Sequence, residues 1–452
     1  MHSAMQRLLR TTAVVGAATL VFAGCSAQGG DATGDGGANG VPQDEKATLE
    51  VWTRTTPGSP SEAATVRQVE AFMEATGYKA EVTAIFDDFE IKLAQRAGQK
   101  DLPDIVLNDV SQLGTMQSQG ILREIDLEEI ENSKDMTAQA LEASKAVDGK
   151  TYGLPYSAQA NALMIRSDWL ATLGLEAPTD WDEMLAVAEA FTTQDPDGNG
   201  QADTYGLAVP GSTKRGYASW YFSNFLWAAG GDFITGSGDE WLPSMTSDEA
   251  VEATTWFRDL QCEAGVMQPG APSMDTPPTN EAFESGVAGM YVTGPYMLPR
   301  FDKVLGADKY EVVPAPQGPK DSSVLAEGGT VYLMAGSENT KGQTAFADWY
   351  VSPEAQAYGM EGTDAFAIQL PVNETVDIAE VRDDPRWQTF ATAYQESGHY
   401  APTIPSWTPV RQMSADTINA LIADCSLDVE DELTKLDGKL TAELLTQGIL
   451  KQ

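Results

Sequence analysis

Strand and helix patterns alternate along residues 48–107, and this alternation constrains the fold more than any other feature. Residues 48–53 alternate apolar and polar positions, as a half-buried strand does. Apolar residues then recur at helical spacing over 61–76, and Gly77 is placed to end that helix. A second strand is predicted at 79–85, a helix at 88–97 and a short buried strand at 105–107. The order β-α-β-α-β predicts an α/β fold with a parallel, open sheet.

Polar residues follow each of these three strands. Ligands of open α/β sheets bind beyond the carboxyl ends of the strands. That rule selects, as candidate ligand contacts, Arg54, Asp88, Asn108, Asp109 and Ser111. An alternative interpretation fits the same positions, because Asp, Asn and Ser are also the residues that cap helices.

The first 45 residues are predicted to form no part of this fold. Arg7 and Arg10 precede an apolar run at 13–23, which predicts a secretory signal peptide at 1–24. Ala23 and Gly24 lie directly before Cys25, an arrangement that resembles the lipobox of bacterial lipoproteins. We expect Cys25 to be lipidated and residues 25–45, which are rich in Gly, Ala and Asp, to be a flexible tether. This predicts a lipid-anchored protein at the outer face of the cytoplasmic membrane.

The chain is strongly acidic, with 67 Asp+Glu against 28 Lys+Arg and a formal net charge of −39. This balance argues against a nucleic-acid partner, because phosphates would be repelled. The sequence has 2 His, too few for catalytic or metal chemistry that needs several imidazoles. Cys262 and Cys425 form an even pair in an exported chain, which predicts a disulfide. Two separately buried thiols are the alternative.

Several short motifs follow one another in a specific order over nearly the whole chain after residue 45. They are LPDIV at 102–106, GKTYGLPY at 149–156, DTYGL at 203–207, FESGVAGM at 283–290, TGPY at 293–296, PAPQG at 314–318 and EGGT at 327–330. Together they resemble the solute-binding lipoproteins of bacterial ABC sugar importers, the large family that includes maltose-binding protein.

This resemblance implies a type II periplasmic-binding-protein fold, in which crossing hinge strands join two α/β lobes around a ligand cleft. The first lobe would take residues 46–155 and 328–375, and the second would take 156–327 and 376–452. The implied function is that of a monomeric receptor, not an enzyme, which needs no cofactor and delivers a mono- or oligosaccharide to ABC permease subunits. The sequence has no Walker-type loop, and in such importers a different subunit hydrolyses ATP.

Aromatic residues are candidates for stacking on the apolar faces of sugar rings. The stretch 215–227 is rich in them, and the resemblance places its early part at the cleft. We therefore expect Tyr217 and Trp220 to contact ligand and Trp227 to belong to the core. Candidates elsewhere in the chain are Tyr156, Tyr296, Trp407, Arg411, Gly328 and Gly329. The two glycines would allow the backbone to approach a ligand closely.

Residues 195–203 match the first nine positions of a calcium loop of the EF-hand type. The candidate metal ligands are Asp195, Asp197, Asn199, Gln201 and Asp203. The twelfth position, however, is Gly206 rather than Glu, and the Asp-Gly-Asn-Gly run at 197–200 is also a common turn sequence. The loop is thus either a structural calcium site or a plain turn.

Two other functions are consistent with these residues. A secreted carbohydrate-active enzyme needs only two carboxylates at a defined separation, although the chain contains neither Gly-x-Ser-x-Gly nor His-Glu-x-x-His. A receptor for a peptide, a polyamine or another organic cation would benefit from the negative charge and could use the same aromatic residues.

Overall fold

The computed structural model describes residues 47–451, which lie within one compact unit, Gln43–Gln452. The predicted signal peptide, the lipidation site Cys25 and the whole of the predicted tether lie outside the described residues. Among residues 47–451, no helix has both the length and the apolar character needed to cross a bilayer.

The first sheet begins as the sequence predicts. Strand β1 (Thr48–Thr53) lies between β2 (Lys79–Ala84) and β3 (Ile105–Asp109), and both neighbours run parallel to it. The helices between these strands are α1 (Pro60–Thr76) and α2 (Phe89–Gln99). Ser59 caps α1 by accepting the Glu62 amide, and Gly77 ends it in the left-handed conformation with φ 73°. The predicted β-α-β-α-β unit is confirmed.

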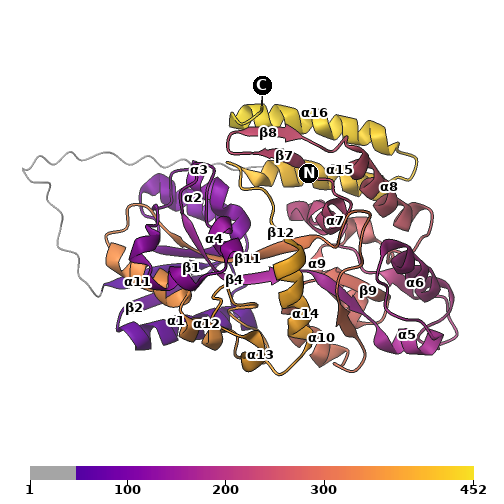
Figure 1. Cartoon of the computed structure of the whole chain (residues 1–452), viewed down its shortest axis with the longest axis horizontal. Coiled ribbons are helices and arrows are strands. Elements are labelled where there is room, and N and C mark those ends of the chain that lie inside the picture. The colour runs from indigo at the N-terminus through magenta and orange to yellow at the C-terminus, as the bar shows by residue number, and fades with distance from the viewer. Residues whose placement is uncertain (1–46, 452) are drawn as a thin grey trace, which may run out of the picture. The chain divides into compact units, whose positions relative to one another are not determined.

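The sheet is mixed rather than wholly parallel, because a strand from late in the sequence completes it. Strand β11 (Val324–Leu333) pairs antiparallel with β3 on one side and antiparallel with β4 (Gly153–Ala160) on the other. The short β12 (Gly398–His399) pairs with the start of β11. Helices α11 (Thr340–Tyr350) and α12 (Pro353–Gly359) then pack beside α1 (Figure 1), where Phe72 meets Phe346 at 4.9 Å between ring centroids.

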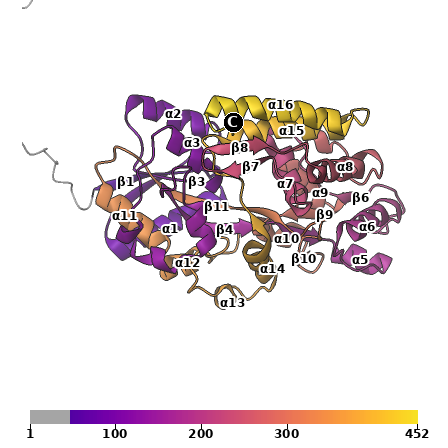
Figure 2. The ribbon, with the colours of Figure 1, turned by 45° about the horizontal axis from the view of Figure 1, so that its top comes forward.

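The second sheet has the order β10-β5-β9-β6. Its strands are β5 (Ala162–Ile165), β6 (Tyr205–Leu207), β9 (Ala288–Thr293) and β10 (Glu311–Val313). The helices of this lobe include α5 (Ser167–Leu173), α6 (Trp181–Thr193), α7 (Tyr217–Ala228), α8 (Asp248–Cys262), α9 (Thr276–Glu284) and α10 (Leu298–Val304). Two long helices, α15 (Trp407–Ala423) and α16 (Val429–Gln447), lie side by side along α7, α8 and the hairpin of β7 (Ile234–Ser237) and β8 (Glu240–Pro243), as Figure 2 shows.

The chain passes between the two sheets along strands that begin in one sheet and continue towards the other. β4 continues into β5 across Asn161, whose side chain donates to Asn224 Oδ1 of α7 at 3.1 Å. β11 returns beside β4, and helices α13 (Ile378–Val381) and α14 (Arg386–Thr392) form part of a third connection. The predicted lobe boundaries at 155/156 and 327/328 fall inside β4 and β11. The division at those residues stays a prediction, because both strands serve both lobes.

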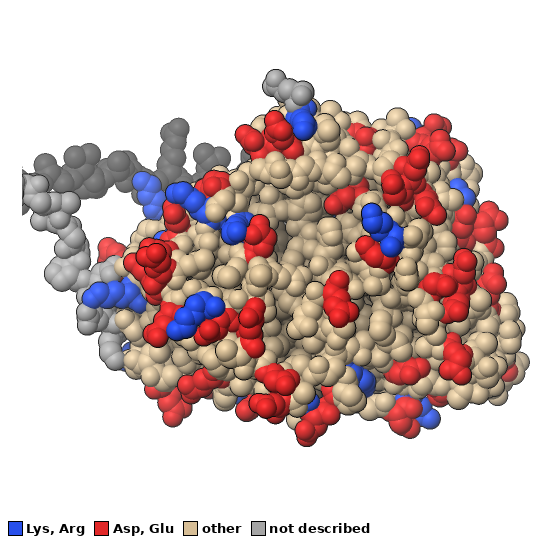
Figure 3. Space-filling view, viewed as in Figure 1, with Lys and Arg blue, Asp and Glu red and all other residues tan. Residues whose placement is uncertain are grey.

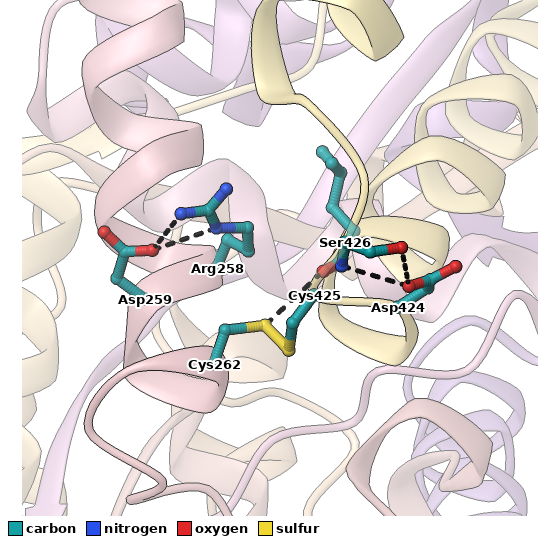
Figure 4. Close-up of a disulfide and its surroundings, with 7 residues drawn as sticks. Arg258, Asp259, Cys262, Asp424, Cys425 and Ser426 are labelled. Atoms are coloured by element: carbon teal, nitrogen blue, oxygen red, sulfur yellow. Dashed lines mark hydrogen bonds and ion pairs between the residues drawn. A yellow bond between two sulfur atoms is a disulfide. The ribbon is translucent and has the colours of Figure 1, made fainter.

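The predicted disulfide between Cys262 and Cys425 is present, with Cα atoms 5.6 Å apart. It joins the last residue of α8 to the turn between α15 and α16 (Figure 4), so it lies wholly within the second lobe. On either side of it, Arg258 pairs with Asp259, and Asp424 accepts from the Ser426 hydroxyl and amide.

Candidate functional site

Two adjoining cavities lie where the two lobes meet. The first, here called the polar compartment, has about 640 Å³ of empty space, including the part open to solvent. The second, the aromatic compartment, has about 690 Å³ on the same basis. Trp220, Glu327 and Arg411 line both, so the two compartments share one wall.

The polar compartment brings together many of the candidates chosen from sequence. Six of them line it: Arg54, Asp109, Tyr217, Trp220, Tyr296 and Arg411. Four further residues complete its walls: Gln159, Arg215, Thr276 and Glu327. Guanidinium, carboxyl, amide and aromatic groups from both lobes thus surround one space.

Arg54 and Asp109 meet because they follow neighbouring strands. Arg54 comes directly after β1 and Asp109 ends β3, and the two strands are paired side by side. Arg54 Nη1 donates to Asp109 Oδ2, and its Nε lies 3.7 Å from Glu90 Oε1. The Arg54 side chain is therefore already neutralised by carboxylates of its own lobe.

Tyr217 and Trp220 lie three residues apart on the first turn of α7, so both face the compartment. Their rings meet edge to face at 6.4 Å. The helix begins after Arg215 and Gly216, which both have positive φ. A Cβ on Gly216 would lie 2.6 Å from Arg411 Cγ, so this glycine is what allows α15 to approach α7.

Tyr296 follows β9, and its hydroxyl lies 3.1 Å from Thr293 Oγ1. Burial raises the pKa of Tyr296, which keeps the phenol neutral and able both to donate and to accept. Trp407 and Arg411 lie one turn apart at the start of α15. Trp407 lines the aromatic compartment, as does Ser111 from the first lobe.

Trp227, which we expect in the core, is buried, with 4% of its surface exposed. It nevertheless lines the aromatic compartment together with Trp220, Phe233, Tyr400 and Trp407. Its ring stacks on His399 at 4.3 Å between centroids, and its Nε1 donates to Asp232 Oδ1 at 3.1 Å. The core assignment is therefore incomplete, because this buried ring also forms part of a cavity wall.

Glu327 is the central residue that the sequence analysis missed. It lies in β11 between the two compartments, where Gln159 Nε2 donates to its Oε2 at 3.4 Å. Burial, reinforced by the nearby Asp109, raises its pKa to about 7, against the lowering effect of a bond from Trp220 and of the Arg411 charge. A charged residue within the otherwise apolar and Gly-rich stretch 324–329 was the signal available in the sequence.

Gly328, Gly329 and Tyr156 have a different explanation from the one predicted. A Cβ on Gly328 would lie 1.9 Å from Ser157 O, and one on Gly329 would lie 2.6 Å from Tyr156 Cζ. The glycines thus allow β4 to pair closely with β11, and neighbouring protein atoms fill the space beside them. None of the three residues lines either compartment. The Tyr156 ring packs on Gly329 and meets Tyr350 of α11 edge to face at 5.2 Å.

Asp88 and Asn108 also line neither compartment. Asp88 is exposed before α2 with φ 57°, and its side chain makes no capping bond there. Asn108 is buried in β3, where its Oδ1 accepts the Asp109 amide at 2.8 Å. This bond fixes the backbone of Asp109, whose side chain lines the polar compartment.

The candidate calcium loop is closed by its own hydrogen bonds. The Asn199 side-chain amide donates to Asp197 Oδ2 at 2.8 Å and to Asp203 Oδ1 at 3.2 Å, and Asp195 accepts the amides of Asn199 and Gly200. Within residues 47–451, no group of three or more His, Cys, Asp or Glu is arranged to hold a metal ion. The Gln201 amide joins these bonds by donating to Asn199 Oδ1, and calcium binding at this loop stays a prediction.

Comparison with known proteins places this geometry in a family. The family model described as bacterial extracellular solute-binding protein matches residues 57–357. A binding protein of Brucella abortus is 23% identical over 354 residues, covering 76% of this chain and 82% of that protein. The fructooligosaccharide ABC transporter substrate-binding protein FusA of Streptococcus pneumoniae is 26% identical over 351 residues, covering 70% of this chain and 62% of that protein.

The fold is shared with solved structures. An ABC transporter solute-binding protein from Thermotoga lettingae, bound with α-D-tagatose, matches with a TM-score of 0.75 at 20% identity, covering 88% of this chain and 99% of that one. The two-lobed architecture and the cavities between the lobes are thus consistent with the family that the sequence matches. The chain belongs to the family of bacterial extracellular solute-binding proteins.

Proposed function

We propose that this protein is the receptor of an ABC importer, which binds a mono- or oligosaccharide between its lobes and delivers it to permease subunits. The observation that carries the proposal is the composition of the polar compartment. Tyr217, Trp220 and Tyr296 offer aromatic faces, while Gln159, Asp109 and guanidinium groups offer hydrogen bonds within the same cavity. Stacking surfaces beside a few placed polar groups are what a pyranose or furanose requires. FusA and the tagatose-bound structure support the same ligand class.

Recognition rather than reaction fits the charges of the cavity. Asp109 is engaged by Arg54, and Glu327 is the only other carboxyl on the walls of the polar compartment. Closure of the lobes about β4 and β11 would bury a ligand, and a permease would read the closed form. A bound oligosaccharide should therefore be recovered intact, whereas a carbohydrate-active enzyme would return it cleaved.

The experiment is a thermal-shift screen of the chain from Gln43 onward, which forms one compact unit, followed by calorimetry. A sugar at about 100 times its dissociation constant should stabilise the fold by roughly 2.7 kcal/mol. Trp220→Ala should lose most of that shift, because the ring belongs to both compartments. A shift with peptides or polyamines alone, or hydrolysis of the sugar, would overturn the proposal in favour of the corresponding rival function.

We also propose that the receptor is held at the outer face of the cytoplasmic membrane by lipid on Cys25. The resemblance of residues 23–25 to a lipobox supports this, and the related lipoprotein LipO of Bacillus subtilis is 31% identical over 151 residues. Mass spectrometry of the membrane-extracted protein tests it. An N-terminal peptide that starts at unmodified Cys25, or upstream of it, would contradict the anchor.

A further inference from the structure

Two arginines of the polar compartment have no acceptor within the described chain. Most arginines of residues 47–451 form ion pairs, namely Arg54, Arg96, Arg123, Arg166, Arg258, Arg300 and Arg386. Arg67 and Arg382 instead donate to backbone carbonyls. In the same part of the chain, the guanidinium groups of Arg215 and Arg411 have neither an ion-pair partner nor a hydrogen-bond acceptor, and both groups line the same cavity.

The fold holds both side chains at this wall. The Arg411 stem lies across Gly216, the residue after Arg215, so the two arginines start from neighbouring backbone. The Arg215 guanidinium lies 5.0 Å from the centroid of Phe86, an aromatic residue of the first lobe. Stacking uses the face of a guanidinium and leaves its in-plane N–H donors available. Those donors have the planar fork geometry that matches an oxyanion.

The charge of this wall is opposite to that of the protein as a whole. The chain carries a net charge of −39, and Figure 3 shows acidic side chains spread over both ends of one face of the molecule. Inside the compartment, however, Asp109 is already neutralised by Arg54. Glu327 is the remaining carboxyl, and burial holds its pKa near 7, so part of the population is protonated at neutral pH. Positive charge is therefore in excess where the ligand would lie.

We propose that the cleft selects an acidic sugar, one whose single carboxylate is bound by Arg215 and Arg411 while its ring stacks on Tyr217 or Trp220. This inference rests on the proposed function and names the ligand class for the same site. A singly charged group fits better than a doubly charged phosphate, because Asp109 and Glu327 line the same space. Two fixed guanidinium groups close to such a carboxylate would give charge-assisted, two-point recognition.

The test is calorimetry with matched pairs of sugars: galactose and galacturonate, glucose and glucuronate, galactobiose and digalacturonate. In at least one pair the acid should bind 10-fold or more tightly than its neutral partner, and its affinity should fall as salt rises from 20 to roughly 500 mM. Arg215→Gln and Arg411→Gln should each remove most of that preference while leaving the melting temperature of the free protein nearly unchanged. Arg67→Gln is the matched control, because Arg67 also lacks an ion pair but lies outside the cleft, and it should keep the preference.

The outcomes separate this inference from the proposed function. If neutral sugars bind as tightly as their acids, the acidic-sugar assignment is wrong and the sugar receptor stands. If galactose 6-sulfate binds and galacturonate does not, the assignment of a carboxylate is wrong. If no sugar of either kind binds, both proposals fail.

Discussion

At the scale of single residues, the ionisation of Glu327 makes the stability of the protein depend on pH. Burial raises its pKa from an ordinary 4.5 to about 7, and Asp109, Arg411, Tyr296 and Tyr400 are the titratable groups coupled to it. Between these two pKa values the folded chain keeps a proton that the unfolded chain releases. Stability contributed by this group is therefore present below pH 4.5 and is lost as pH rises towards 7.

Glu327→Gln should remove this loss. The measured quantity is the unfolding free energy of the variant minus that of the native chain. This difference should be about 2 kcal/mol larger at pH 8 than at pH 5, since one pKa unit corresponds to about 1.4 kcal/mol. Urea denaturation at both pH values measures the difference. An equal effect at pH 5 and pH 8 would show that the carboxyl ionises normally in the folded protein.

Only part of the site follows from sequence, and individual residues show why. The rule for open sheets predicts Arg54 and Asp109, because they end paired parallel strands. It cannot predict Glu327, because its position beside Gln159 depends on strand pairing between residues that are 168 positions apart in the sequence. For Gly328, the sequence reveals a missing side chain but not that Ser157 backbone fills the space. For Trp227, periodicity predicts burial but cannot indicate that a cavity adjoins the buried ring.

At the scale of elements, the close pairing of β4 with β11 leaves no room for a side chain at Gly328. Gly328→Ala would place Cβ 1.9 Å from Ser157 O, a backbone atom that cannot move aside. We expect a loss of about 1–3 kcal/mol in unfolding free energy, measured by urea denaturation. Gly98→Ala in α2 is the control, because nothing lies within 4 Å of its Cβ, and it should be neutral or slightly stabilising. Equal stability of the two variants would mean that the strands separate without cost.

The local elements of the first lobe are predictable because each depends on neighbouring residues. The predicted helix at 61–76 corresponds to Pro60–Thr76, and the strand at 79–85 to Lys79–Ala84. The antiparallel insertion of β11 is not predictable in this way, since its partner β3 lies more than 200 residues earlier. A short apolar strand pattern contains no information about which edge it joins.

At the scale of the whole molecule, the disulfide should affect stability but not ligand binding. It lies beyond the last turn of α15, whereas Trp407 and Arg411 lie on the first turns, roughly 20 Å away along a 17-residue helix. Replacing Cys262 and Cys425 together by Ser should lower the free energy of unfolding by about 2–5 kcal/mol. Thermal denaturation measures this, with the reduced native chain as the control. A change in sugar affinity at a temperature where the variant is folded would contradict the separation of the two regions.

The interleaving of the chain between the sheets has a consequence for the order of assembly. The second sheet has all its strands once residue 313 has been synthesised, whereas the first waits for β11 at residues 324–333 and for β12 at 398–399. Until β11 arrives, β3 has an unpaired edge, although its three-stranded unit was made more than 200 residues earlier. The sheet that is started first is thus completed last, and the strand that pairs with its open β3 edge is the one that carries Glu327.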